Sequence, residues 1–281
     1  MNSTLAQASH KVAAVQMVSA AEVGSNLSQA EALIANAVAE GAELVVLPEN
    51  FAHMGIAETD KLVLRERPGD GPVQAFLASQ AQRHGIWLVG GTIPLATADP
   101  ARVRATSLVY DDHGNQVARY DKIHLFDVNL NEANETYRES DTIEPGDQVV
   151  VLNTPFGRMG IAVCYDLRFA EMFRAMATTG LDLIALPAAF TATTGQAHWE
   201  VLLRARAVEN LCYVVAAGQG GRHVNGRETF GDSMIVDPWG KVLSRLARGP
   251  GVVTATLDPT QIDRLRRNFP VLSHRRTELW K

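Results

Sequence analysis

The chain has few cysteines and no long apolar run. Only Cys164 and Cys212 occur among its 281 residues, which is too few for a disulfide framework and favours a reducing, cytoplasmic compartment. No apolar run approaches the roughly 18 residues that a membrane-spanning helix requires. The first residues, MNSTLAQASHKV, lack a basic start followed by a long apolar stretch, so we expect neither a secretion signal nor a membrane partner.

Positive charge and metal-binding patterns are also scarce. Lysine and arginine together number 26 against 31 aspartates and glutamates, which gives a formal net charge of −5. Without a broad basic field, we expect no nucleic-acid partner. The eight histidines are scattered, without acidic or cysteine partners at the spacing of metal ligands, so we expect no metal and no other cofactor.

The chain does contain a succession of short apolar segments. Apolar residues make up 46% of the sequence and charged residues 20%, as in a globular protein with a large core. Apolar periodicity predicts helices over residues 27–38, 72–84, 169–179, 200–210 and 259–268, with Asn26 capping the first. Strands are predicted over residues 11–16, 44–47, 86–90, 104–110, 116–120, 149–153, 159–163, 183–186, 213–217, 233–236, 242–246 and 251–257.

This order of elements implies an α/β fold. Early alternation of strands and helices, followed by hairpins, is typical of mixed sheets with helices on the outside. The sequence has no linker, repeat or low-complexity stretch. We therefore expect a flexible N-terminus over residues 1–10 and a single domain over residues 11–281.

Three of the predicted strands end in a reactive side chain. Glu49 follows the strand at 44–47, Lys122 follows the strand at 116–120, and Cys164 follows the strand at 159–163. Catalytic groups of open α/β sheets gather at the carboxyl ends of strands, so these distant residues are expected to meet. Cys164 would stand at a strand-to-helix turn, where helix-start N–H groups favour a thiolate.

A glutamate, a lysine and a cysteine together suffice for amide hydrolysis. A thiol is a strong nucleophile only when deprotonated, and a nearby carboxylate can take its proton. The same carboxyl group can then protonate the leaving amine and later activate water. A lysine ammonium can stabilise the oxyanion that forms when the thiol attacks the carbonyl carbon. This chemistry passes through a thioester.

Each of these residues also has a purely structural interpretation. Cys164 could be a small core hydrophobe, Glu49 an exposed loop carboxylate and Lys122 a solvated strand end. Residue types alone do not justify joining the three into one site.

Three longer segments supply that connection. LPENF at residues 47–51, YDKIHLFD at 120–127 and CYDLRF at 164–169 resemble, in the same order, the signature segments of the nitrilase superfamily of carbon–nitrogen hydrolases. The similarity runs from about residue 12 to residue 276. It implies an αββα sandwich whose copies pair through the outer helices, so we expect a homodimer or a higher homo-oligomer.

The resemblance also implies a role for each reactive residue. By position in the segments, Glu49 would be the general base, Lys122 would stabilise the tetrahedral intermediate and Cys164 would be the nucleophile. The backbone N–H of Tyr165 would complete the oxyanion site.

A second glutamate is often found in the family downstream of the lysine. Glu139, within YRES at residues 137–140, matches this position best. Glu132 and Glu135 lie in the same predicted loop and are the alternatives.

The second half of the chain narrows the choice of substrate. Residues 198–223, HWEVLLRARAVENLCYVVAAGQGGRH, and residues 231–242, GDSMIVDPWGKV, resemble the deaminated glutathione amidases. CYDLRF and TTGQAHWE at 193–200 are similar to the related omega-amidases as well. The resemblance implies an amidase that converts deaminated glutathione to 2-oxoglutarate and Cys-Gly.

Other functions stay open at this point. An omega-amidase acting on 2-oxoglutaramate or 2-oxosuccinamate, or an N-carbamoyl hydrolase, would use the same chemistry. A catalytically inactive binding scaffold is the alternative from a different class. A papain-like enzyme would need a histidine partner in a motif context, and the chain offers none.

A small anionic amide substrate requires a cation in its pocket. Arg168, four residues after Cys164, is a candidate because a guanidinium binds carboxylates in a bidentate manner. Its alternative is a structural ion pair with Glu171. Thr194, in the TTG segment, is a further expected substrate contact. Arg222 could reach the far end of a longer substrate or could simply be solvated.

Overall fold

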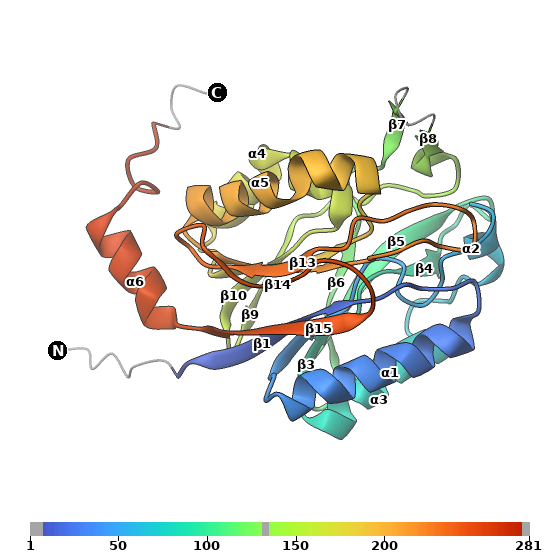
Figure 1. Cartoon of the computed structure of the whole chain (residues 1–281), viewed down its shortest axis with the longest axis horizontal. Coiled ribbons are helices and arrows are strands. Elements are labelled where there is room, and N and C mark those ends of the chain that lie inside the picture. The colour runs from blue at the N-terminus through green and yellow to red at the C-terminus, as the bar shows by residue number, and fades with distance from the viewer. Residues whose placement is uncertain (1–7, 131–134, 277–281) are drawn as a thin grey trace.

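Two β-sheets packed face to face form the centre of the protein, and helices cover both outer faces (Figure 1). The computed structural model describes residues 8–130 and 135–276. The predicted αββα sandwich with mixed sheets is therefore confirmed. No helix among the described residues is both long and apolar enough to cross a membrane.

The first sheet has seven strands. They are β1 (His10–Gln16), β2 (Leu44–Val46), β3 (Trp87–Val89), β4 (Ile93–Ala96), β5 (Val103–Tyr110), β6 (Gln116–Asp121) and β15 (Gly251–Leu257). The order is β15-β1-β2-β3-β5-β4, with β6 also paired to β5. β1, β2 and β3 are parallel, and β5 is antiparallel to both β3 and β6. β6 therefore runs in the same direction as β2.

The second sheet has six strands. They are β9 (Val150–Thr154), β10 (Gly157–Ile161), β11 (Leu183–Ala188), β12 (Tyr213–Gly218), β13 (Ser233–Val236) and β14 (Val242–Leu246). The order is β14-β13-β12-β11-β10-β9, and the central strands β10, β11 and β12 are parallel. Each sheet thus has a parallel centre whose carboxyl ends can hold catalytic groups.

Helices α1 (Val23–Ala39) and α3 (Pro72–His84) cover the first sheet, and α4 (Ala170–Thr178) and α5 (Ala192–Asn210) cover the second (Figure 1). In β1, Val12 and Ala14 pack between the sheets, whereas Ala13 and Val15 pack toward the helices. Both faces of the strand are buried, which explains its continuous apolar run. Helix α6 (Pro259–Asn268) follows β15 outside the sandwich (Figure 1).

Two helices begin earlier than predicted. The prediction that Asn26 caps α1 is wrong, because its side chain lies within the helix and binds the backbone of Ala20 and Ala52. Helix α5 begins at Ala192 rather than at residue 200. The hydroxyl of Thr191 caps it by accepting a hydrogen bond from the N–H of Thr194, which stabilises a turn that apolar periodicity does not mark.

Three strands and one helix were not predicted. Strand β4 is short and contains a proline, as edge strands often do. Strands β7 (Asp127–Leu130) and β8 (Glu135–Arg138) form a separate two-stranded sheet, and α2 (Asp60–Val63) is a single turn. The predicted flexible N-terminus covers residues 1–10, of which residues 1–7 lie outside the described residues. His10 already belongs to β1, where it pairs with Leu257 of β15.

Candidate active site

Glu49, Lys122 and Cys164 come together at the carboxyl ends of β2, β6 and β10. Glu49, Lys122 and Cys164 are only 3%, 2% and 7% exposed, respectively. Glu49 is therefore not an exposed loop carboxylate, and Lys122 is not a solvated strand end. The Lys122 ammonium donates a hydrogen bond from Nζ to Glu49 Oε1 at 2.8 Å. Both groups also act electrostatically on the Cys164 thiol. The structure thus brings together the three residues that the sequence connects.

The backbone is sharply turned at two of these strand ends. Cys164 has a φ of +49°, and Asn50, directly after Glu49, has a φ of +57°. Residues other than glycine seldom adopt this left-handed conformation, and such strain is concentrated at functional sites. Cys164 begins a 3-10 helix (Cys164–Arg168) rather than an α-helix. The chain therefore turns at the nucleophile itself.

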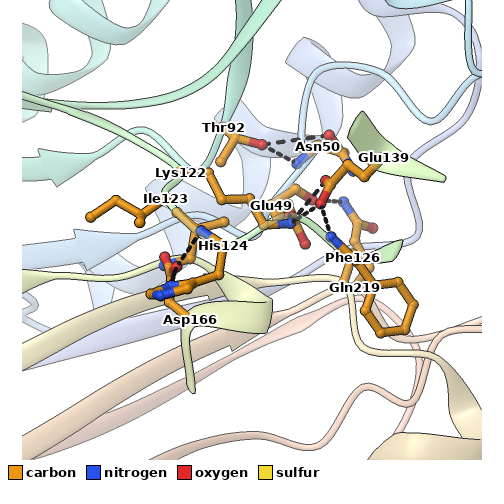
Figure 2. A network of polar contacts seen from close by, with 12 residues as sticks. Glu49, Asn50, Thr92, Lys122, Ile123, His124, Phe126, Glu139, Asp166 and Gln219 are labelled. Carbon is orange, nitrogen blue, oxygen red and sulfur yellow. Dashed lines mark hydrogen bonds and ion pairs between the residues drawn. The ribbon is translucent and has the colours of Figure 1, made fainter. Parts of the chain in front are cut away.

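Lys122 is held by a second carboxylate. Its Nζ donates to Glu139 Oε1 at 2.8 Å and to Oε2 at 2.9 Å, and the Phe126 N–H donates to Glu139 Oε2 at 2.7 Å (Figure 2). Of the two alternatives, Glu135 instead accepts from the Tyr137 hydroxyl, at 3.1 Å, and Glu132 lies outside the described residues. Glu139 is thus the glutamate of this segment that the structure connects to the lysine.

The electrostatic environment keeps Lys122 and Glu139 charged. Burial alone would lower the pKa of Lys122, but Glu139 and Glu49 outweigh it and raise that pKa well above its usual value. Burial alone would raise the pKa of Glu139, but Lys122 and the Phe126 N–H outweigh it and lower that pKa. The two side chains therefore form an ionised pair at neutral pH.

The surroundings of Cys164, in contrast, favour its uncharged form. Burial and the Glu49 carboxylate raise the pKa of Cys164 well above its usual value, although Lys122 and the N–H of Ala189 act in the other direction. The resting residue is a thiol, which differs from the expectation that helix-start N–H groups favour a thiolate. Because burial and the Glu49 carboxylate together outweigh Lys122 and the Ala189 N–H, the sulfur must lose its proton during attack, and Glu49 is the adjacent acceptor.

A buried aspartate that the sequence analysis left without a role joins the lysine and cysteine segments. Asp166 accepts a hydrogen bond from His124 Nδ1 at 2.7 Å (Figure 2). It also accepts from the Tyr120 hydroxyl at 2.6 Å and from the Val163 N–H at 2.8 Å. The His124 ring also stacks on Phe169, with 3.6 Å between centroids. These contacts fix the distance between the two segments, and only the tertiary structure reveals them.

Glu49 is positioned through its backbone. Gln219, which lies beside Glu49 in Figure 2, donates from Nε2 to the Glu49 carbonyl at 3.0 Å. The same Nε2 donates to Ser19 Oγ at 2.8 Å. The N–H of Asn50 donates to Thr92 Oγ1 at 2.9 Å. Gln219, within the glycine-rich segment at residues 218–221, therefore holds the backbone of Glu49 in place.

One cavity opens over these side chains, and Arg168, Tyr165 and Thr194 contribute to its lining. Arg168 donates from Nη1 to Nδ1 of His198 at 3.1 Å and lies over the ring of Phe190 at 5.2 Å. Within the described residues it forms no ion pair with Glu171, so its guanidinium is available to an anion. Thr194 lies in the first turn of α5, with its hydroxyl 2.9 Å from that of Thr191.

Two other arginines of the cavity, Arg138 and Arg227, were not named from the sequence. Arg227 lines the cavity, donates from Nη2 to the Ala189 carbonyl at 2.6 Å and lies over the Tyr137 ring at 5.1 Å. Arg222, the candidate named from the sequence, is exposed and does not line the cavity. Nothing in the sequence distinguishes Arg222 from Arg227 within this one loop. Over residues 8–130 and 135–276, no group of three or more histidine, cysteine or acidic side chains could hold a metal.

The αββα fold and this cluster fit an enzyme that hydrolyses carbon–nitrogen bonds. The profile of the carbon-nitrogen hydrolase family matches residues 11–267, and the chain belongs to this family. The resemblance to the nitrilase superfamily is thereby confirmed, and the protein is a carbon–nitrogen hydrolase.

Several relatives carry a more specific name. The chain is 43% identical to the deaminated glutathione amidase of Synechocystis sp., over 94% of this chain and 97% of that one. It is 41% identical to the deaminated glutathione amidase of Yersinia enterocolitica, over 94% and 92%. The crystal structure of the Caenorhabditis elegans NitFhit protein superposes with a TM-score of 0.91 at 37% identity, covering 99% of this chain and 67% of that one.

Proposed function

We propose that the protein hydrolyses the amide of deaminated glutathione to 2-oxoglutarate and Cys-Gly. The observation that carries this proposal is the buried Glu49–Lys122–Cys164 cluster beneath a cavity lined by Arg168, which forms no ion pair within the described residues. The chain is also 41–43% identical to deaminated glutathione amidases. The cluster supplies amide chemistry, and Arg168 supplies a partner for an anionic acyl group.

In the first half of the reaction, Glu49 takes the proton of Cys164 as the sulfur attacks the amide carbon. The carbonyl oxygen becomes an oxyanion, which the Lys122 ammonium and the Tyr165 N–H stabilise. The carbon–nitrogen bond then breaks, and Glu49 returns its proton to the leaving amine. A thioester between Cys164 and the 2-oxoglutaryl group is left.

In the second half, Glu49 takes a proton from water as its oxygen attacks the thioester. The carbon–sulfur bond breaks, 2-oxoglutarate leaves, and the sulfur regains a proton from Glu49. Glu139 stays ionised throughout and keeps Lys122 charged and in place. Arg168 and Thr194 bind the acyl end, so that the carbonyl carbon lies next to the sulfur.

Steady-state kinetics test this proposal directly. Purified protein is given deaminated glutathione, 2-oxoglutaramate and an N-carbamoyl amino acid, and release of 2-oxoglutarate or ammonia is followed with glutamate dehydrogenase. We expect the highest kcat/KM for deaminated glutathione and no turnover by Cys164→Ala. A higher kcat/KM for 2-oxoglutaramate would identify an omega-amidase instead. The absence of turnover with all three would favour the binding scaffold.

We also propose a homodimer paired through the outer helices of the second sheet. Val201 and Val208, two turns apart on the outward side of α5, are 61% and 44% exposed. Exposed apolar side chains of this size mark association surfaces when they cluster. Light scattering should give twice the chain mass, and Val201→Glu should shift it toward the monomer. A monomeric wild-type protein would contradict this arrangement.

We further propose a cytoplasmic location. Cys164 and Cys212 are both free, and free thiols persist most readily in a reducing compartment. Cell fractionation with an antibody against the protein tests this, and recovery in an extracytoplasmic fraction would contradict it.

A further inference from the structure

Three arginines line the cavity, namely Arg138, Arg168 and Arg227, and none of them forms an ion pair with a carboxylate among the described residues. Arg138 is exposed, whereas Arg168 and Arg227 are partly buried. We propose that Arg227 binds the terminal carboxylate of the leaving dipeptide and so makes the enzyme selective for the dipeptide amide over a simple amide. This inference rests on the proposed function and assigns Arg227 as a specificity residue. Arg168 would then bind the acyl end of the substrate, and Arg227 would bind the end that leaves.

The Arg227 guanidinium is held in place by its surroundings. One face lies on the Tyr137 ring, and Nη2 binds the carbonyl of Ala189, whose N–H acts on the Cys164 thiol. The Arg227 backbone N–H donates to Asn225 Oδ1 at 3.0 Å, and Asn225 Nδ2 donates to the Gly55 carbonyl at 2.9 Å. Such fixation lowers the entropy lost on binding an anion.

The hydrogen-bonding capacity of Arg227 is not used up. Its Nε is buried and has no partner within the described residues, and no described acidic group forms an ion pair with it. Lys61, which also lines the cavity, is by contrast neutralised by Glu58 at 2.6 Å. A partly buried cation without a counter-charge is costly unless a ligand provides one, and a carboxylate matches a guanidinium best.

The two partly buried arginines differ in their relation to the nucleophile. The Cys164 thiolate, when formed, raises the pKa of Arg168, although burial lowers it overall. Arg168 belongs to the 3-10 helix that begins at Cys164. Arg227 belongs to a different segment and lies over the ring of Tyr137 in β8. In deaminated glutathione the 2-oxo acid carboxylate is fewer bonds from the scissile carbonyl than the glycine carboxylate is. Arg168 therefore suits the acyl end, and Arg227 suits the end of the leaving group.

A substrate-trimming experiment tests this assignment. The kcat/KM is measured for deaminated glutathione and for its analogue in which the glycine carboxylate is a carboxamide. Wild type should prefer the acid by roughly 10–100-fold, the value of one charge-assisted interaction. Arg227→Gln should reduce that preference to about onefold, whereas Arg168→Gln should lower both values and keep the ratio. Arg222→Gln, a change at an exposed arginine of the same loop, should leave both values unchanged.

The ratio of the two substrates removes any general damage caused by a variant. If wild type turns over deaminated glutathione but does not distinguish the two substrates, the assignment of Arg227 is refuted and the proposed function stands. The same holds if Arg227→Gln keeps the full preference. If wild type does not hydrolyse deaminated glutathione at all, the proposed function itself fails. Because the wild-type ratio is informative alone, the test does not depend on the folding of a variant.

Discussion

Replacing Glu139 with glutamine tests how Lys122 is held in the active site. The Glu139 carboxylate accepts two hydrogen bonds from Nζ and one from the Phe126 N–H. Glutamine keeps the size and one acceptor oxygen but loses the charge, and its NH₂ group cannot accept. Lys122 would retain Glu49 as its charged partner, so the proposed base would be bound more firmly to the ammonium. Both stability and turnover should fall.

The magnitude follows from the number of charged contacts that are lost. A hydrogen bond to a charged group contributes about 1.5–3 kcal/mol to stability, and the desolvation of Glu139 in the wild type offsets part of this. We therefore expect the free energy of unfolding to fall by about 1.5–2 kcal/mol. The same loss in the transition state corresponds to a decrease in kcat of roughly 10–30-fold, because 1.36 kcal/mol is a factor of ten.

The loss in stability should also depend on pH. Burial opposes ionisation of Glu139, but Lys122 and the Phe126 N–H outweigh it and lower its pKa. A carboxylate with a lowered folded-state pKa adds stability above its unfolded-state value of about 4.3, and this contribution disappears as the pH falls through the folded-state value. The difference between wild type and Glu139→Gln should therefore be full at pH 7 and shrink below about pH 4.

Urea unfolding at several pH values and steady-state kinetics measure these effects. The matched control is Glu135→Gln, on the same hairpin, since Glu135 binds Tyr137 rather than Lys122. The control should change kcat less than about twofold and stability by less than about 0.5 kcal/mol. Wild-type kcat and stability in Glu139→Gln would refute the reasoning, as would equal losses in the control.

Three further outcomes follow from the surroundings of the nucleophile. Burial and Glu49 raise the pKa of Cys164, so iodoacetamide should label it slowly at neutral pH, and the labelling rate should still rise above about pH 8.5. A labelling rate that is already level at pH 7 would contradict this. Glu49→Gln should label faster than wild type at the same pH while losing turnover, and slower labelling, measured by mass spectrometry, would oppose it. Asp166→Asn should lower the unfolding free energy by about 2–4 kcal/mol. Asp112→Asn, at an exposed position, should not. Equal urea midpoints for Asp166→Asn and wild type would argue against the Asp166 network.

The convergence of the catalytic cluster could be predicted only in part from local signals. The strands before Glu49 and Cys164 are apolar runs that stop at a reactive residue, whereas the strand before Lys122, QVARYD, is mixed. Strand ends are where catalytic groups gather, but the resemblance of the three segments was needed to join residues from two different sheets. Glu139 could be named because it matches the position of the second glutamate in the family. Its contact with Lys122 depends on strands β7 and β8, which are too short and too polar to predict from an apolar pattern.

Features set by tertiary contacts could not be predicted. The roles of Asp166 and Arg227 depend on partners 42 to 46 and 38 residues away along the chain. The protonation state of Cys164 depends on burial and Glu49, which raise its pKa, and on Lys122, which lowers it. Residue types alone do not reveal which of these effects is larger. The early start of α5 depends on one hydroxyl at Thr191, which outweighs the weak helical pattern of the following residues.

The two carboxylates that share the Lys122 ammonium are not equivalent. Glu139 also accepts the Phe126 N–H, so its ionised form is stabilised from two sides. The Glu49 side chain has only Lys122 as a hydrogen-bond donor from a charged group in the described structure, and it borders the thiol. Two acids placed in different environments can take different roles. Because Glu139 holds the lysine charge, Glu49 can gain and lose a proton without releasing Lys122 from the oxyanion site.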